Sequence, residues 1–565
     1  MDIKEAIMKY ALQNALKFNG RANIGAVIGK LVSEDPKLKK DMKAISEEVK
    51  KIVAKVNKMK KAEQEKQFEK YKGKIKEKKR KERHGLPELR NAKKGKVIMR
   101  FEPSPSGPLH VGHAYVISLN SEYCRIYKGK MLLRIADTNP ENIYEPSYGL
   151  IQEDAKWVTK NNISKVIIQS DRLGYYYDYA EKLIKAGNAY VCTCTADNFR
   201  ELSRQGTACP CRSKSPAEHL ERWKKMFAEY KPGEAVVRIK TDIKHPNPAM
   251  RDWPAIRIND HTHPRKGTEH RVWPLMNFSV AIDDMLLGVT HAIRAKEHMD
   301  NEKRQKWVFD YFRKTPPTHL YVGRINFKGL EVSCTKTKAK IQLGEFDSWD
   351  DIRLPFLLAL RRRGYQPDAF VKYAVAVGVS ETDKTVSGDE FFKSLNAYNK
   401  EVLEPMANRY FFVPNPKEIK IEKALPQQVV QIELHPDFPK RGKRKFVTAE
   451  KFYIMEDDYR SLKTGKLYRL MDSLNFRKRG SKLVYDSWEY EHYKEKGEMI
   501  MHWLPVQDDL ARIELLMPDK TIQKGLGEPL IRKLKPGAVV QFERIGFCRL
   551  DRIENNIFKF WFAHR

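Results

Sequence analysis

Two histidines three residues apart are the side chains of this sequence with the clearest chemical potential. His110 and His113 follow a turn rich in proline, serine and glycine in the stretch 100–114, R-F-E-P-S-P-S-G-P-L-H-V-G-H-A. A strand that runs through such a turn into a helix directs free backbone N–H groups and the positive end of the helix toward one point. Imidazole N–H groups beside that point can stabilise charge that develops on a transferring nucleotide. The stretch therefore predicts a nucleotide site in which His110 and His113 are catalytic.

The small residues of this stretch support the same interpretation. Gly107 permits a tight backbone turn, and Gly112 presents no side chain, so that a flat ring can lie against the helix. Ser106 precedes the turn glycine, and we expect these three residues to bind the nucleotide. A lone pair of histidines at this spacing is more often a pair of surface or capping residues. The glycines, the prolines and the apolar segment before them favour a binding site here.

Four of the seven cysteines form two clustered pairs. Cys192 and Cys194 lie in C-T-C, Cys209 and Cys211 lie in C-P-C, and fourteen residues separate the pairs. Clustered thiol pairs in a chain with no secretory signal favour a metal site over disulfides, and four thiolates suit tetrahedral zinc in a closed, structural site. Redox pairs or chance clustering are the alternatives. We predict a structural Zn²⁺ held by these four residues.

The elements that position the histidines follow from the pattern around them. An apolar segment at 97–101, a stretch with helical spacing over 110–127 and a second apolar segment at 131–136 form a strand–helix–strand unit, which begins a parallel α/β sheet. A strand near 167–170 continues the alternation, and the chain is expected to return to the sheet at 281–294 and 319–325.

The residue patterns at the two ends of the chain predict different secondary structures. Residues 1–57 predict amphipathic helices, and 58–84 predict a solvated basic helix or linker. A helical zone follows residue 345. From about 405, short β-branched and aromatic runs between glycine, proline and asparagine predict strands of one or two small barrels.

Composition indicates an anionic partner. The 565 residues contain 107 Lys and Arg against 73 Asp and Glu, a net charge of +34, which favours nucleic acid over a merely colloidal role. Basic runs recur at 74–83, 361–363, 440–445 and 477–479, as expected for a long ligand that crosses several domains. No apolar run approaches the ~18 residues of a membrane helix, and the N-terminus does not have the pattern of a secretory signal. We expect a multidomain cytoplasmic protein that does not bind membranes.

Several ordered motifs carry a resemblance to one family. The stretch around His110 resembles the "HIGH" signature of class I aminoacyl-tRNA synthetases, with Val111 in place of isoleucine. Together with RIADTNP, YVCTC…CPCR, GVTHAIRAKEH, SWDDIRLP…ALRRRG and LYRLMDSLNF, it resembles the archaeal-type glutamyl-tRNA synthetases of the glutamyl/glutaminyl subgroup over nearly the whole chain. The resemblance implies an ATP-dependent ligase that forms glutamyl-adenylate and transfers glutamate to the 3′ end of tRNA.

The resemblance also implies a multidomain α/β and all-β architecture. The expected parts are an N-terminal helical domain with a basic linker at 1–92, a Rossmann-like parallel catalytic sheet at 93–190 and 271–345, a zinc-containing acceptor-end insertion at 191–270, a helical stem-contact region at 346–404 and β-barrel anticodon-binding domains at 405–565.

A second signature of the family is a mobile, lysine-rich segment that clamps the triphosphate. Its counterpart by resemblance is VSCTKTKAK, 332–340, which places Thr335 and Lys336 where the family has a Ser-Lys pair, with Lys338 nearby. We expect Lys336 to be catalytic and Thr335 and Lys338 to bind ATP, from a loop that closes after ATP binds. On the residues alone, an exposed basic loop is the alternative.

The resemblance assigns the amino-acid pocket to Arg100, Ser104 and Arg294, and an arginine fork favours glutamate over glutamine. Two positions depart from the family. Ala136 stands where an acidic residue usually holds the substrate ammonium group, and Met276 stands where the family has tyrosine. Three alternatives follow from these departures: other residues rebuild the ammonium contact, the pocket accepts another substrate, or the protein has lost the ability to activate an amino acid.

The resulting expectations are ATP with Mg²⁺ and structural Zn²⁺ as cofactors, and glutamate and glutamate tRNA as substrates. Glutamine tRNA as a further substrate, and other synthetases bound through the N-terminal helices, are additional possibilities. The competing hypotheses are a catalytically impaired tRNA-binding paralogue, and a synthetase for glutamine or another amino acid. A truncated enzyme that modifies a tRNA base is disfavoured because the C-terminal region is present.

Overall fold

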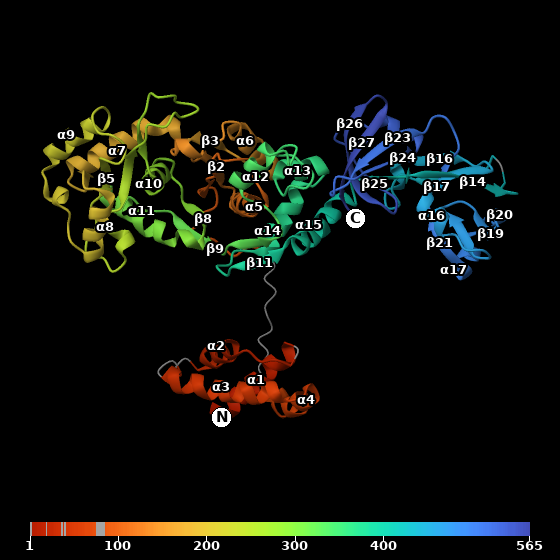
Figure 1. Cartoon of the computed structure of the whole chain (residues 1–565), viewed down its shortest axis with the longest axis horizontal. Helices are drawn as coiled ribbons and strands as arrows, with labels where there is room; N and C mark the ends of the chain where they lie inside the picture. The colour runs from red at the N-terminus through yellow and green to blue at the C-terminus, as the bar shows by residue number, and fades with distance from the viewer. Residues whose placement is uncertain (1–2, 19, 36–37, 39–40, 75–84, 426) are drawn as a thin grey trace. The chain divides into compact units, whose positions relative to one another are not determined.

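The computed structural model describes residues 3–18, 20–35, 38, 41–74, 85–425 and 427–565 (Figure 1). The chain divides into two compact units, 1–84 and 85–565. Most of the basic run predicted at 74–83 lies outside the described residues.

The N-terminal unit is a helical bundle, as predicted. Its helices are α1 (Ile3–Lys17), α2 (Ile24–Glu34), α3 (Met42–Lys58) and α4 (Lys61–Phe68), followed by the 3-10 helix η2 (Glu69–Lys74). Apolar residues at helical spacing, among them Ile7, Leu12, Val49 and Val53, bury one face of each of the long helices in a common core.

A parallel sheet carries the predicted nucleotide turn. Strands β1 (Ile98–Phe101), β2 (Lys130–Ile135) and β3 (Lys165–Ile168) pair in parallel, and α5 (Val111–Ile126) connects the first two. The predicted strand–helix–strand unit is confirmed. A second parallel pair, β8 (His291–Ala295) and β9 (Thr318–Val322), lies beside β1, because the backbone N–H of Thr290 donates to Ile98 O at 2.9 Å.

The insertion between these two parts of the sheet has a core of its own. Strands β4 (Ala189–Cys192), β5 (Val236–Ile239), β6 (Pro254–Ile258) and β7 (Val272–Pro274) form an antiparallel sheet in that order. Helices α7 (Leu173–Lys185) and α9 (Pro216–Met226) pack on it, and α8 (Ala196–Gln205) lies beyond the first cysteine pair. The next helix, α10 (Met276–Leu286), returns the chain to the parallel sheet and is followed by α11 (Met299–Tyr311).

The lysine-rich segment predicted as a loop is a helix, α12 (Cys334–Gln342). Ser333 caps it, since its hydroxyl oxygen accepts from the backbone N–H of Lys336 at 3.4 Å. Lysine, alanine and glutamine are good helix formers, which explains why the segment is helical once it has a cap. The prediction of a loop at 332–340 was wrong. Strand β10 (Ile325–Lys328) precedes this segment in the chain and pairs in parallel with β11 (Lys384–Ser387).

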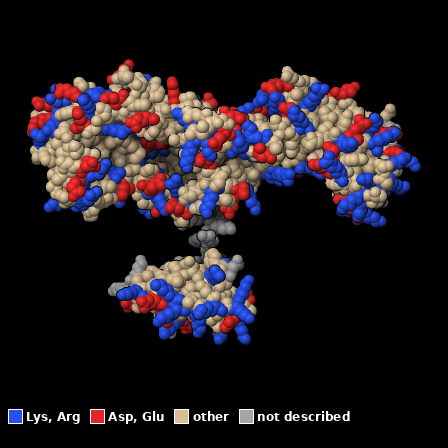
Figure 2. Space-filling model, in the orientation of Figure 1, with Lys and Arg blue, Asp and Glu red and all other residues tan. Residues whose placement is uncertain are grey.

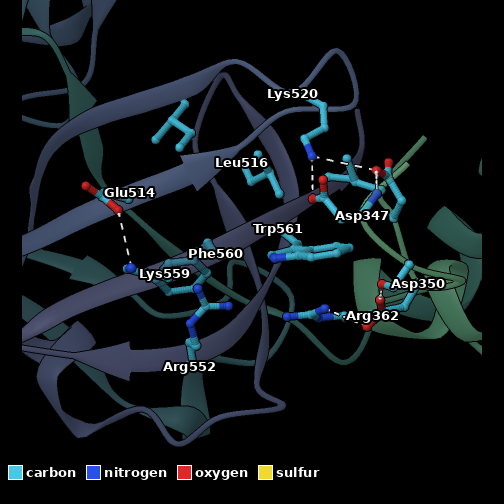
Figure 3. Close-up of a pocket in the computed structure, with 14 residues that line it drawn as sticks. Asp347, Asp350, Arg362, Glu514, Leu516, Lys520, Arg552, Lys559, Phe560 and Trp561 are labelled. Atoms are coloured by element: carbon cyan, nitrogen blue, oxygen red, sulfur yellow. Dashed lines mark hydrogen bonds and ion pairs between the residues drawn. The ribbon is translucent and has the colours of Figure 1, made fainter. Parts of the chain in front are cut away.

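The predicted helical zone contains α13 (Leu357–Arg363), α14 (Pro367–Val377) and α15 (Gly388–Leu403). Its basic run is not a free patch. Arg362 pairs with Asp350 at 2.6 Å and lies over the ring of Trp561 (Figure 3). It also pairs with Asp551 at 2.7 Å, and these contacts join the helical zone to the C-terminal sheets. Arg363 donates to Phe562 O and Ala563 O. These arginines stabilise a junction, contrary to the expectation of a ligand-binding run.

The C-terminal region contains two seven-stranded sheets, which come close to the predicted barrels. Strands β12 (Asn408–Tyr410) and β13 (Phe412–Pro414) lie at opposite edges of one sheet, although only Phe411 separates them, so the two edges must approach each other. In the other sheet, β21 (Gly497–Met501) and β22 (Leu504–Pro505) are related in the same way. Residues 85–565 thus combine α/β and all-β parts.

Lys and Arg side chains are spread over the visible face of the molecule rather than gathered in one tail (Figure 2). Among the described helices, none is long and apolar enough to cross a membrane.

Candidate active site

The turn after β1 presents the two histidines side by side at the start of α5. His110 is the N-cap residue, and its Nδ1 accepts from the backbone N–H of Gly112 at 3.1 Å. The backbone N–H of His110 in turn donates to Nδ1 of His113 at 3.4 Å. The rings stack with centroids 3.8 Å apart. Because each Nδ1 accepts a backbone hydrogen bond, the proton of each neutral ring is on Nε2, and each histidine offers one Nε2–H donor.

Both histidines are neutral at physiological pH. Burial lowers the pKa of His113 to about 4. Burial, with the neighbouring His113, lowers the pKa of His110 well below its usual value. They therefore stabilise negative charge as hydrogen-bond donors rather than as cations.

Gly107 holds the turn against the lysine-rich helix. A Cβ at this position would lie 2.8 Å from Cys334 Sγ and 3.1 Å from the ring of Trp349. A side chain here would force α12 away from the turn, so the close approach requires glycine. At Gly112, a Cβ would instead meet the ring of His110 at 3.0 Å. The space over this glycine is therefore shared with the imidazole.

The predicted lysine cluster lies on the helix that contacts this turn. Thr335 and Lys336 are exposed in the first turn of α12, and Lys338 Nζ lies 5.1 Å from the ring centroid of Tyr144. Tyr144 donates its backbone N–H to Pro105 O in the turn at 2.8 Å. The lysines are thus carried by an element anchored to the candidate nucleotide site.

Beside the turn is a cavity of about 300 Å³ that contains all three residues predicted for amino-acid binding. Arg100, Ser104 and Arg294 line it. Arg100 is the last residue but one of β1 and is 4% exposed, and Arg294 comes from β8 and is 9% exposed. The carboxyl ends of parallel strands are the usual place for such a site.

The fork of Arg100 is already paired. Its Nε and Nη2 donate to the two oxygens of Asp284 at 2.6 and 3.0 Å, and its Nη1 lies 3.2 Å from Glu102 Oε2. Burial would raise the pKa of Asp284, but the Arg100 and Arg134 charges hold it below its usual value. Because Asp284 occupies both Nε and Nη2, only Nη1 of Arg100 can contact a ligand in this conformation. The predicted contact of the whole guanidinium fork with a ligand carboxylate is therefore not available here.

Arg294 is less fully engaged. Its Nη2 donates to Gln305 Oε1 at 2.8 Å and lies 3.8 Å from Asp284 Oδ2, while its buried Nε has no hydrogen-bond partner among the described residues. Burial and the Arg100 charge lower the pKa of Arg294 to about 10, so the guanidinium is still cationic at pH 7.

Sequence reasoning missed the residues that surround these arginines. Arg134 is fully buried, with its Nη2 2.7 Å from Glu102 Oε2 and its Nη1 3.3 Å from Asp283 Oδ2. Arg172 pairs with Asp283 at 2.6 Å. The adjacent acids in the AIDD stretch were a signal, since two buried carboxylates require cations.

The resulting network has an excess of positive charge. It contains four arginines and three acids, hence a net charge of +1: Arg100, Arg134, Arg172, Arg294, Glu102, Asp283 and Asp284. A site with this balance attracts one further carboxylate.

The two departures from the expected pattern both lie in this cavity. Ala136 and Met276 line it. Asp137, the residue after Ala136, cannot substitute, because it is buried and accepts from Tyr148 Oη at 2.7 Å and from the backbone and hydroxyl of Ser170 at 2.8 and 2.7 Å.

The four predicted metal ligands come together. The sulfurs of Cys192, Cys194, Cys209 and Cys211 all lie within 4.8 Å of one another. The Cys192–Cys209 and Cys194–Cys211 separations are 3.9 Å. A tetrahedral site with Zn–S bonds of ~2.3 Å separates its sulfurs by about 3.8 Å. Arg222 Nη1 also donates to Cys211 Sγ at 3.3 Å, which favours the thiolate form that a metal requires.

Comparisons with known proteins match most of the chain to one family. Residues 96–405 match the family "tRNA synthetases class I (E and Q), catalytic domain". Residues 407–491 and 490–551 match two models of the anti-codon binding domain of the same family.

Curated relatives match over the full length of both chains. A glutamate–tRNA ligase of Methanobrevibacter smithii is 43% identical over 566 residues, one of Thermococcus onnurineus is 44% identical over 580, and one of Pyrococcus furiosus is 43% identical over 583, each covering 100% of both proteins. The chain therefore belongs to the class I tRNA synthetases of the glutamate and glutamine (E and Q) family, in which its relatives are glutamate–tRNA ligases.

Proposed function

We propose that this chain is a glutamate–tRNA ligase that binds ATP at the turn before α5 and glutamate in the adjoining arginine-lined cavity. The observation that carries the proposal is the position of Ser104. It lies in the turn that leads to His110 and also lines the cavity that contains Arg100 and Arg294. A nucleotide phosphate at the turn and a carboxylate ligand in the cavity would therefore be neighbours.

In the first step, the α-carboxylate of glutamate attacks the α-phosphorus of ATP, and pyrophosphate leaves. The Nε2–H groups of His110 and His113 donate to the phosphate oxygens on which charge develops. Ser106, Gly107 and Gly112 shape the surface for the nucleotide. Lys336 and Lys338 neutralise charge on the pyrophosphate, and the hydroxyl of Thr335 binds the nucleotide. No side chain forms a covalent intermediate, so catalysis rests on positioning and charge.

Mg²⁺ would accompany ATP and be held mainly through phosphate oxygens. The residues present fit this role, since Glu102 is the only acid among the described residues that line the cavity, and arginines engage it. In the second step, the 2′-hydroxyl of the terminal adenosine loses its proton and attacks the carbonyl carbon of glutamyl-adenylate, so that the glutamyl ester forms and AMP leaves, as class I membership implies.

The amino-acid side of the site favours glutamate over glutamine. The excess positive charge of the arginine network is balanced by a side-chain carboxylate but not by an uncharged amide. Arg100, Arg294 and Ser104 are the proposed contacts.

The tRNA would extend from the insertion to the C-terminal sheets. Zinc held by the four cysteines would stabilise the insertion rather than take part in catalysis. The helical region at 346–404 would contact the stem, and the sheets at 405–565 would stack anticodon bases. Four expectations stay predictions. They are the domain limits at 92, 190, 270, 345 and 404, a cytoplasmic location, the charging of glutamine tRNA, and the binding of other synthetases by the N-terminal helices.

A second candidate, a tRNA-binding protein with impaired activation, is favoured by Ala136, by Met276 and by the departure of the lysine-rich segment 332–340 from the family signature. ATP–pyrophosphate exchange with glutamate, measured with tRNA present, separates the two. Exchange above the no-glutamate background supports the ligase. Tight tRNA binding without exchange or charging supports the second candidate.

The direct test is formation of glutamyl-tRNA by the purified chain with bulk tRNA and ATP, against a panel of labelled amino acids. We expect glutamate to be attached and the Arg100→Ala variant to lose most of the activity. Attachment of glutamine or another amino acid instead would contradict the glutamate assignment.

A further inference from the structure

The structure assigns a specificity role to Glu102: we propose that its carboxylate binds the α-ammonium group of the substrate amino acid. This inference rests on the proposed function and deepens it. No other acidic side chain is found among the described residues that line the arginine-rich cavity. An amino acid brings a positive ammonium group into a site dominated by guanidinium groups, and it requires an anion there.

The carboxylate of Glu102 is held from one side only. Its Oε2 lies 2.7 Å from Arg134 Nη2 and 3.2 Å from Arg100 Nη1. Its Oε1 is buried and has no hydrogen-bond partner among the described residues. A buried carboxylate oxygen without a donor is unfavourable, because it has lost its hydrogen bonds to water and gained none from the protein. The unused oxygen therefore favours a ligand that donates.

Small motion suffices to present that oxygen. The Glu102 side chain is 15% exposed, and Oε1 is covered by protein atoms in this conformation. The terminal torsion of a glutamate is broad, and rotation about it moves both oxygens together, so that one can turn toward the cavity while the other faces the arginines. The arginines fix the position of the group and leave its second oxygen for the ligand.

Glu102 also lies next to the position where an acid was expected. Phe101 at the end of β1 pairs with Leu133 of β2, so residues 102 and 136 follow neighbouring parallel strands. The backbone N–H of Ala136 donates to Pro103 O at 2.9 Å. The methyl group of Ala136 contributes no charge, and the carboxylate of Asp137 is saturated by Tyr148 and Ser170. The negative charge of this wall therefore comes from Glu102.

The test compares two ligands that differ only in the ammonium group. Glutarate has both carboxylates of glutamate but no amine. We expect Glu102→Gln to raise the KM for glutamate in tRNA-dependent ATP–pyrophosphate exchange by on the order of tenfold to a hundredfold, as expected for a lost charged hydrogen bond. The inhibition constant of glutarate should not rise and should be equal or lower, because the variant removes a negative charge from a site that binds two carboxylates. Glu122→Gln, which alters an exposed pair with Arg125 on α5, is the matched control and should behave as the wild type.

The variants also distinguish a direct contact from a positioning role. If Glu102→Gln weakens glutamate and glutarate equally, the residue acts by orienting Arg100 and Arg134, and the inference is wrong. An unchanged KM for glutamate also overturns it. Adding Ala136→Asp to Glu102→Gln should recover part of the lost affinity, and Glu102→Asp should fall between Gln and wild type. If the wild-type chain forms no glutamyl-tRNA, the proposed function itself is wrong. If the wild type forms glutamyl-tRNA and Glu102→Gln has the same KM for glutamate, only this inference is wrong.

Discussion

The backbone N–H of His110 donates to Nδ1 of His113 at 3.4 Å, and the two imidazoles stack at a centroid distance of 3.8 Å. This contact links a backbone group at the helix start to a side chain one turn on, and it fixes the tautomer of His113. The two rings are thus oriented before any ligand binds, which lowers the entropy lost when a phosphate is bound.

The depressed pKa of His113 predicts a pH dependence of stability. Its folded-state pKa of about 4 is below the ~6.5 of an unfolded chain, so the unfolded state binds more protons between these values. The free energy of unfolding should therefore fall as pH drops from about 6.5 to about 4 and be flat above. Urea denaturation of wild type and His113→Gln at several pH values measures this. Parallel curves for the two proteins would contradict the assignment.

Gly107→Ala should separate the turn from α12. The added methyl group would lie 2.8 Å from Cys334 Sγ, so the helix must shift, and we expect the KM for ATP to rise at least severalfold. Gly149→Ala in α6 (Ser147–Val158) is the control, because no atom lies within 4 Å of the place that its methyl group would take. Alanine there should be neutral or stabilising by up to about 1 kcal/mol. Equal KM values for ATP in both variants would argue against a functional contact between turn and helix.

The buried arginine network should depend on Asp284. Asp284→Ala removes the buried carboxylate that accepts from both Nε and Nη2 of Arg100 and lies 3.4 Å from Nη1 of Arg134, and we expect it to lower the free energy of unfolding by about 3–5 kcal/mol. Asp178→Ala breaks an exposed pair with Lys182 and should leave the free energy of unfolding almost unchanged, because solvent screens such a pair. Chemical denaturation of both variants provides the comparison, and a small effect at Asp284 would show that the network is not stabilising.

The cysteine cluster predicts one zinc ion per chain. Elemental analysis of the purified protein should give one equivalent, and Cys211→Ser should reduce it, since serine is a poorer zinc ligand. Removal of zinc by a chelator should lower the melting temperature. Cys548→Ser, at a buried cysteine of the C-terminal sheets, should retain the full zinc content. If wild-type protein purified from cells grown with zinc contains none, the assignment is contradicted.

The local parts of the site could be predicted from the sequence, and the tertiary parts could not. The strand before His110 and the helix after it follow from apolar spacing and turn residues that are close in the chain. The partner of Arg100 is Asp284, 184 residues away, and no local pattern identifies it. The same holds for Arg362 and Asp551, which turn a basic run into a structural junction.

The lysine-rich segment shows a different kind of failure. Its resemblance to a mobile signature favoured a loop, whereas the cap at Ser333 and the helix-forming residues after it favour a helix. The residue types of this segment therefore predict its structure better than the resemblance does.

The most direct test of the central claim is a crystal structure with a non-hydrolysable analogue of glutamyl-adenylate. We predict that its phosphate mimic lies within hydrogen-bond distance of Nε2 of His110 or His113, and that its glutamyl side chain enters the cavity of Arg100 and Arg294. An analogue bound elsewhere, with this turn and cavity empty, would contradict the account.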